Sequence, residues 1–195
     1  IDGDLVLEPG QNGDFSKLDD QPGSGGDPVT PTYLDLTAIE SEALNTSNSL
    51  AGMSPTQSFG DIDDTTTINR TGEINVIYVD EIVLSGSESL TLDGSEDDYF
   101  IINTNKIKLS GNSSIQLDGD LENSRVVFNL LPGSTTLHLT GGSAGYSGMF
   151  LAPQPTTSVK VSGNATLQGS VVAGNGITIS GSAQIVHSPI ECDDD

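Results

Sequence analysis

From Ile74 onward the sequence repeats itself, and this repetition limits the possible folds more than any other feature of the chain. Five segments align, and their starts at Ile74, Tyr99, Arg125, Gly148 and Ser170 are 25, 26, 23 and 22 residues apart. Each segment opens with an apolar strand, continues with an alternating strand that ends in Ser-Gly or Thr-Gly, and usually adds a third short strand. One coil of a β-solenoid requires such a unit, with glycine turning the corner.

Alternation in the middle strand of each segment predicts which side chains face the core. In Ile107-Lys108-Leu109 the two aliphatic residues point into the coil and the lysine points outward. The equivalent triplets are Leu137-His138-Leu139, Val159-Lys160-Val161 and Ile177-Thr178-Ile179. Stacked coils pair in parallel, so equivalent positions recur about every 4.8 Å. A β-sandwich of evenly spaced strands is the rival architecture, but it does not explain the recurring Ser-Gly corner.

One amphipathic helix is expected between Tyr33 and Leu50, because Leu36, Ile39, Ala43 and Leu50 fall on one helical face. Thr32 is a candidate N-cap, and Gly52 followed by Pro55 would end the helix.

The domain organisation that we expect has three parts: a short N-terminal strand over residues 1–9, a Gly/Pro-rich connection over residues 10–32, and a helix plus solenoid over residues 33–195. The first and third parts would form one domain. The strand either caps its own solenoid or adds to a neighbouring subunit by β-augmentation, which would build a filament. The residues that would do so are Asp2, Leu5, Val6 and Leu7.

The charge of the chain limits its partners. With 28 acidic residues against 6 Lys plus Arg, the formal net charge is −22, which disfavours nucleic acid and anionic membranes as partners. Calcium is the cofactor to consider, because hard cations take carboxylate oxygens in exposed turns, and solvated turn acids are the alternative. None of the candidate clusters has the EF-hand spacing: Asp61, Asp63 and Asp64; Asp93, Glu96, Asp97 and Asp98; Asp118 and Asp120.

An extracellular or cell-surface location fits the remaining features. No run of about 18 apolar residues could span a bilayer. No secretory signal is present, so we expect that any such signal has been removed. Cys192 is the only cysteine, which excludes an intrachain disulfide and leaves an incidental thiol or an intermolecular bridge. Four glycosylation sequons start at Asn45, Asn69, Asn112 and Asn164.

Catalysis is not expected. The chain has two histidines, His138 at an outward strand position and His187 near the C-terminus, so a Ser-His-Asp arrangement has few ways to form. Acidic pairs such as Asp97 with Asp98, or Asp118 with Asp120, are the candidates that a polysaccharide-acting solenoid enzyme would use.

The residues from the helix to the last repeat resemble the choice-of-anchor A domain of bacterial surface proteins, also described as an ice-binding-like adhesive domain. The resemblance covers roughly residues 31–186 and rests on the order of the helix TPTYLDLTAIESEALNTSNSLAGMSP, the strand INVIYVDEIVLSGSESLTLDG, the Ser-Gly corners, and FLAP ahead of GSVVAGN. It implies a mainly β fold, a right-handed discontinuous β-helix with one long α-helix alongside, placed in a cell-surface adhesin.

The outward positions of the aligned triplets are Val83, Lys108, His138, Lys160 and Thr178. This column lacks the uniform hydroxyls and methyls that ice binding demands, but it gathers cationic groups on an acidic chain. The lysines either discourage sideways strand pairing or pair with acidic neighbours, or they form a docking stripe for an acidic partner.

We therefore predict a non-catalytic adhesive module that binds a glycan or protein ligand, with Lys108, His138, Lys160 and Thr178 as the candidate ligand or assembly face. A self-assembling filament subunit is the alternative. An ice-binding protein and a polysaccharide-acting enzyme are lesser ones.

Overall fold

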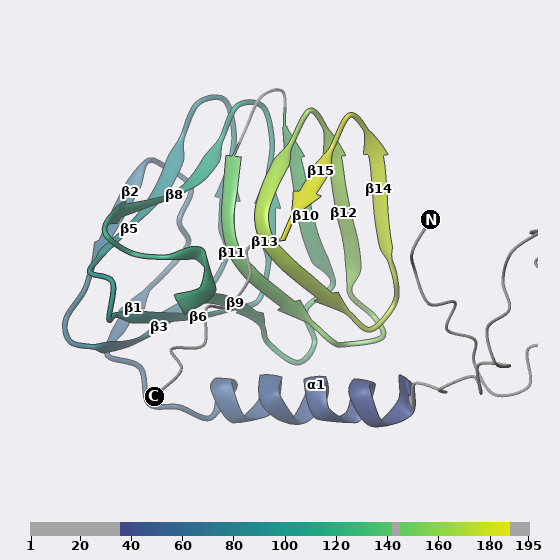
Figure 1. Cartoon of the computed structure of the whole chain (residues 1–195), viewed down its shortest axis with the longest axis horizontal. Coiled ribbons are helices and arrows are strands. Elements are labelled where there is room, and N and C mark those ends of the chain that lie inside the picture. The colour runs from purple at the N-terminus through teal and green to yellow at the C-terminus, as the bar shows by residue number, and fades with distance from the viewer. Residues whose placement is uncertain (1–35, 142–144, 188–195) are drawn as a thin grey trace, which may run out of the picture. The chain divides into compact units, whose positions relative to one another are not determined.

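The computed structural model describes residues 36–141 and 145–187 (Figure 1). The chain divides into two compact units, residues 1–42 and 43–195. The described part of the first unit is the beginning of helix α1 (Leu36–Ala51), and the strands all belong to the second unit.

The strands form three parallel sheets. The seven-stranded sheet contains, in spatial order, β1 (Gln57–Phe59), β3 (Ile74–Val79), β6 (Tyr99–Thr104), β9 (Val126–Leu130), β11 (Gly145–Ala152), β13 (Thr166–Ala173) and β15 (Gln184–Val186). The five-stranded sheet contains β14 (Ile177–Gly181), β12 (Ser158–Gly163), β10 (Thr136–Gly141), β7 (Ile107–Leu109) and β4 (Ile82–Leu84). The three-stranded sheet contains β2 (Thr66–Asn69), β5 (Ser89–Gly94) and β8 (Ser114–Gly119).

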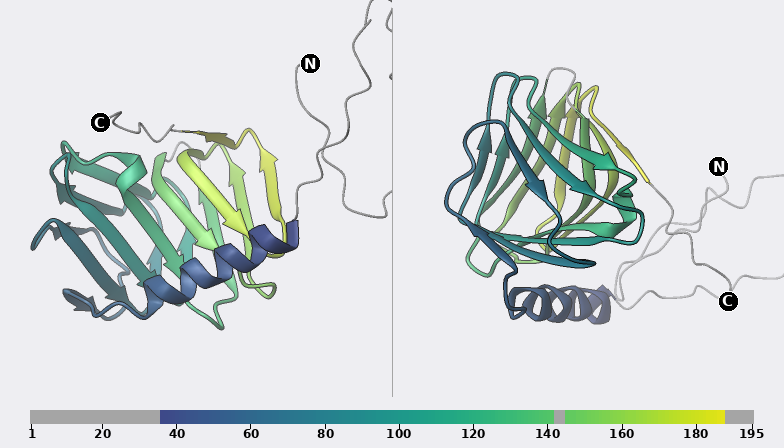
Figure 2. Two further views of the ribbon diagram at one scale, coloured as in Figure 1. Left: turned by 60° about the horizontal axis from the view of Figure 1, so that its bottom comes forward. Right: turned by 90° about the vertical axis from the view of Figure 1, so that its left-hand side faces the viewer.

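Consecutive strands lie in different sheets, which makes the second unit a β-solenoid of about six coils. Strands β3, β4 and β5 occupy the three sheets in turn, and each pairs in parallel with its counterpart β6, β7 or β8 in the next coil. Figure 2, in its right-hand view, shows the coils end-on with the sheets around a common core. The predicted solenoid is confirmed, and the parallel pairing excludes the sandwich.

The middle strands pair in the predicted register, but the segment alignment is wrong by one residue at two points. Met149 stands beside Val127 and Ser170 beside Met149, whereas the alignment of the segment starts would pair Met149 with Val126 and with Val171. The reason is that β11 and β13 each continue around a corner at a glycine, Gly148 with φ 114° and Gly169 with φ 142°. The two glycines are register partners, so the equivalent of Gly148 in the next coil is Gly169 and not Ser170.

Aliphatic side chains stack in rows inside the coils and form one continuous core. The two inward residues of the central triplets in β4, β7, β10 and β12 are buried, as the alternation predicts. Phe128 and Phe150 stack within the core with ring centroids 4.9 Å apart. Each fully buried side chain of this size contributes about 1.5–3 kcal/mol to the free energy of unfolding.

The Ser-Gly and Thr-Gly corners need glycine for two reasons, and Gly163 shows both. Its φ of 81° lies in the left-handed region, which costs other residues energy. A Cβ at this position would also overlap the carbonyl oxygen of Gly141 in the preceding coil. Coils can therefore stack at this corner only while residue 163 lacks a side chain.

Helix α1 confirms the predicted helix, but its contact with the sheet is polar. Ser47 is buried and its Oγ donates to Asn129 Oδ1 at 2.7 Å. Asn129 Nδ2 donates to the Ser47 carbonyl at 2.9 Å and to Asn103 Oδ1 at 2.8 Å, and Asn103 Nδ2 donates to the Leu50 carbonyl at 3.0 Å. Ile39, which the sequence places on the packed face, remains 45% exposed.

The two ends of the solenoid differ in the burial of their inward side chains. Ile62 and Ile68 in the first coil are 4% and 1% exposed. Ile177 and Ile179 of β14 are 39% and 52% exposed. Among the residues that the structure describes, nothing stacks on β14, so this end of the core is open.

Candidate functional site

The outer surface of the five-stranded sheet carries the candidate ligand face. Val83, Lys108, His138, Lys160 and Thr178 are consecutive partners in the parallel register of β4, β7, β10, β12 and β14. Neighbouring strands lie about 4.8 Å apart, so these five residues form one straight column across the coils. We call Lys108, His138 and Lys160 the cationic column.

The lysines of the cationic column are exposed and form no ion pair. The ion pairs within residues 36–141 and 145–187 join Arg70 to Asp98 and Lys106 to Glu81, the latter at 2.7 Å. His138 Nε2 lies 3.4 Å from Ser158 Oγ, a weak contact. The column therefore presents cationic groups to solvent with no carboxylate partner in the described part of the chain.

His138 lies between the two lysines of the column. Partial burial of the imidazole lowers the pKa of His138 below its usual 6.5, and the charges of Lys160 and Lys108 lower it further. The imidazole is accordingly neutral at pH 7. An anion placed on the column would favour its protonation, because the anion would offset both lysines.

The charge of the chain is unevenly distributed. Residues 123–190 contain no aspartate or glutamate, although the whole sequence contains 28. This stretch forms β9 to β15 and supplies two of the three residues of the cationic column. The absence of acidic residues from this stretch can be read from the sequence. Its relation to the candidate ligand face appears only once the fold places the stretch in the last coils of the solenoid.

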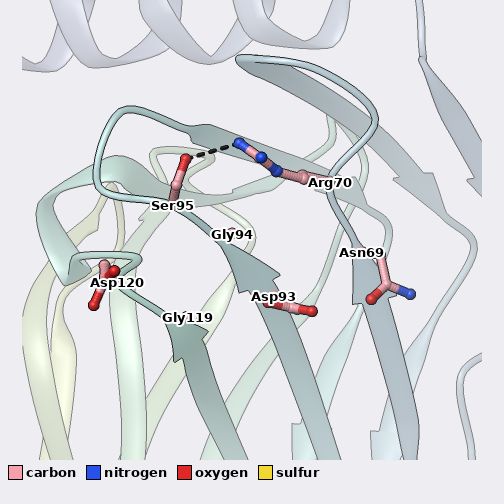
Figure 3. A pocket seen from close by; sticks show the side chains of 7 residues that line it. All are labelled: Asn69, Arg70, Asp93, Gly94, Ser95, Gly119 and Asp120. Atoms are coloured by element: carbon pink, nitrogen blue, oxygen red, sulfur yellow. Dashed lines mark hydrogen bonds between the residues drawn. The ribbon is translucent and has the colours of Figure 1, made fainter.

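A polar pocket lies where the three-stranded sheet ends. It has a volume of about 270 Å³ and is lined by Asn69, Arg70, Asp93, Gly94, Ser95, Gly119 and Asp120 (Figure 3). Arg70 Nη1 donates to Ser95 Oγ at 2.8 Å. Asn69, Asp93 and Asp118 are register neighbours on β2, β5 and β8.

Asp98 next to this pocket has a structural role. It is buried, and its Oδ2 accepts hydrogen bonds from the Ser95 backbone N–H at 2.7 Å, from Ser95 Oγ at 2.9 Å and from Arg70 at 3.1 Å. The Ser95 N–H bond is the main reason that the pKa of Asp98 lies below its usual value, and the Arg70 guanidinium adds to it. Its carboxylate is therefore already satisfied.

The acidic clusters do not assemble into a metal centre. Within the described ranges, no three His, Cys, Asp or Glu side chains lie together in a way that could hold a metal ion. Asp61, Asp63 and Asp64 are exposed between β1 and β2, and Glu96 and Asp97 are exposed between β5 and β6.

The remaining candidate residues are the four sequon asparagines, the N-terminal residues and Cys192. The sequon residues are all exposed: Asn45, Asn69, Asn112 and Asn164. The N-terminal strand with Asp2, Leu5, Val6 and Leu7, and Cys192, lie outside the described residues. No helix in the described part of the chain is long and apolar enough to cross a membrane.

The stacked coils and the register-aligned column define a class: a β-solenoid domain that presents regular rows of side chains on its outer sheets. The chain belongs to the ice-binding-like adhesive domain family, whose model matches residues 3–186. No curated protein matches the chain.

Solved structures of ice-binding proteins share the fold. One is from an Arctic yeast, with a TM-score of 0.62, 16% identity and coverage of 82% of this chain and 65% of the yeast chain. Another, from the Antarctic ascomycete Antarctomyces psychrotrophicus, has a TM-score of 0.61, 17% identity and coverage of 79% and 72%. A third, from an Antarctic Flavobacteriaceae bacterium, has a TM-score of 0.61, 17% identity and coverage of 82% and 36%. This chain thus spans less than two thirds of the yeast and bacterial proteins.

Proposed function

We propose that this chain is a non-catalytic, extracellular or cell-surface adhesive module that binds a glycan or protein ligand through the outer surface of its five-stranded sheet. Membership of an adhesive domain family supports the class of function. The cationic column supports the choice of surface, because its exposed lysines have no ion-pair partner in the described part of the chain and are available to a ligand.

The observation that carries the proposal is that, among the residues that the structure describes, Lys108 and Lys160 have no carboxylate partner, while Lys106, which directly precedes β7, has one. Lysines that only disfavour sideways strand pairing would be expected at the open edge of a sheet. Lys108 and Lys160 instead lie on strands that are paired on both sides, β7 and β12. Their charges therefore have no role in protecting an edge.

A binding screen tests the proposal. The full chain is applied to immobilised glycans and extracellular matrix proteins, together with a variant that carries Lys108→Gln, His138→Gln and Lys160→Gln. A Thr91→Ala variant, altered on the outer surface of the three-stranded sheet, is the matched control. We expect binding by the wild type and the control and loss in the triple variant. Equal binding by all three proteins would show that another surface holds the ligand.

Self-assembly is the second candidate function, and the open end of the solenoid favours it. Leu5, Val6 and Leu7 are all apolar, and so are Ile177 and Ile179, whose side chains are partly exposed. The N-terminal strand could pair with β14 of a second copy and bury them. Electron microscopy of the chain with and without residues 1–9 tests this function. Concentration-dependent polymers that the deletion abolishes would support it, whereas a monomer at every concentration would refute it.

Ice adsorption is not favoured for this chain, although its structural neighbours are ice-binding proteins. Their identity to this chain supports a shared fold alone. The column on the five-stranded sheet contains valine, two lysines, histidine and threonine in place of uniform small hydroxyl groups. We expect no thermal hysteresis in the purified chain, and a measurable freezing-point gap would restore the ice-binding alternative.

A further inference from the structure

We infer that the cationic column is a binding site for a linear acidic glycan, one that carries carboxylate or sulfate groups along its chain, and that protonation of His138 strengthens the binding. This inference rests on the proposed function and names the ligand class of the same surface.

The straightness of the column favours a linear ligand. Lys108 and Lys160 stand two strands apart, about 9.6 Å between their backbones, with His138 between them. A single small anion could bind closely to only one of the two lysines. A chain with repeated anionic groups could lie along the column and contact all three residues together, which adds their separate contributions.

Hydroxyl groups beside the column suit a sugar. Thr136 and Ser158 are register partners on one side of the column, and Thr140 and Ser162 are partners on the other. The hydroxyl of Ser158 already approaches His138, and that of Thr140 donates to the Leu109 carbonyl at 2.8 Å while keeping its acceptor capacity. Ser162 is buried, so a polyhydroxylated ligand could exchange hydrogen bonds with Thr136 and Ser158 on one side of its charged groups and with Thr140 on the other.

The uneven charge distribution lets an anion reach this surface of an acidic protein. Acids are absent from residues 123–190, and Glu81 at the edge of the same sheet is paired with Lys106. At physiological ionic strength charges further apart than about 8 Å are largely screened. Acidic residues that lie beyond this distance from the column therefore repel a ligand on it only weakly.

The protonation of His138 links binding to pH. The charged groups that face it are Lys108 from β7 and Lys160 from β12, and Ser158 is its polar contact. Its pKa lies below 6.5 in the free protein, and a bound anion raises that pKa. The ligand-bound form thus takes up a proton more readily, so affinity increases as the pH falls through the pKa of the bound form and levels off below that of the free form.

The first experiment compares ligands. Binding of the full chain is measured with polygalacturonate, dextran sulfate, neutral dextran and polyglutamate of similar length. We expect binding to both acidic glycans and at least about tenfold weaker binding to dextran and polyglutamate. Equal binding to polyglutamate would overturn the glycan assignment. Binding to neutral glycans or to matrix proteins alone would overturn the inference while the adhesive function stands, and binding to nothing would overturn both.

The second experiment compares variants of equal charge. Lys108→Gln with Lys160→Gln should weaken acidic-glycan binding about tenfold, because two exposed charge contacts are lost. Lys106→Gln with Arg125→Gln removes the same two positive charges at positions outside the column and should change binding less than about twofold. An equal loss in both variants would show that general charge, and not the column, governs binding.

The third experiment measures how binding depends on pH. Between about pH 7.5 and about pH 5.5 the wild type should bind several-fold more tightly as the pH falls. The slope should disappear in His138→Gln and persist in His187→Gln. A slope that survives in His138→Gln would assign the pH dependence to another group and overturn that part of the inference.

Discussion

Replacement of Asn129 by alanine should destabilise the protein through the polar contact between helix α1 and the solenoid. Asn129 is fully buried and makes three hydrogen bonds, two with Ser47 and one with Asn103. The substitution removes the side-chain amide and affects three groups: the Ser47 hydroxyl and Asn103 Oδ1 lose this partner, and the Ser47 carbonyl keeps only its helical bond from Ala51.

The size of the effect follows from these three groups. A net intramolecular hydrogen bond contributes about 0.5–1.5 kcal/mol, and a buried group left without a partner costs about 1–3 kcal/mol. Water entering the small space would restore part of the loss. We therefore expect Asn129→Ala to lower the free energy of unfolding by about 3 kcal/mol. For a chain of this length that corresponds to a fall in Tm of about 6–12 °C.

The assay is thermal unfolding followed by far-ultraviolet circular dichroism, combined with amide hydrogen exchange over residues 43–51. The matched control is Asn105→Ala, because Asn105 is exposed and its one side-chain bond, to Tyr78 Oη, is 3.3 Å long. The control should lower stability by less than about 0.5 kcal/mol. If the two variants melt within about 2 °C of one another, the hydrogen bonds to Ser47 and Asn103 do not stabilise the helix and our reasoning is wrong.

Three further predictions concern the corner, the buried acid and the metal. Gly163→Ala should lower stability by about 2–4 kcal/mol, since it combines a left-handed φ with an overlap at Gly141, while Gly60→Ala, where a Cβ meets nothing, should have little effect in the same denaturant titration. Asp98→Asn should make stability fall less steeply in acid. Because the pKa of Asp98 is lowered in the folded protein, its contribution to stability is present above about pH 3.8 and is lost as the pH falls through the folded-state pKa. Tm measured from about pH 5 to about pH 2.5 tests this prediction. Thermal midpoints with calcium and with chelator should coincide, and a higher midpoint with calcium would reveal a site that the acidic clusters do form.

The solenoid could be predicted from the sequence because its signal is local and repeated. The alternation within a triplet such as Ile107-Lys108-Leu109 indicates which side chains face the core, and the spacing of the recurring corner glycines indicates the length of a coil. The alignment failed by one residue at Gly148 and Gly169, because a strand that bends around a corner looks in sequence like two separate strands. The helix position was found, but not Ser47 as its buried contact, since a serine that is satisfied by a distant asparagine gives no apolar signal.

The candidate site was accessible to sequence reasoning only in part. The column of Lys108, His138 and Lys160 followed from the triplets, and the structure places these residues side by side. The pairing of Lys106 with Glu81, which makes the other two lysines distinctive, joins residues 25 positions apart and depends on the stacking of coils. The same is true of Asp98, which the sequence offered as a metal ligand and which bonds Arg70 and Ser95.

Because every strand of the solenoid bonds only to the strands beside it in its sheet, one coil could be duplicated or lost as a unit during evolution. Duplicating one would lengthen each outer row by a single step without disturbing the sheets on either side. A gene that gains or loses some two dozen codons could thus change the number of outward side chains in each row. In such a lineage the length of the outer rows would change in steps of one coil, in addition to the substitution of single side chains.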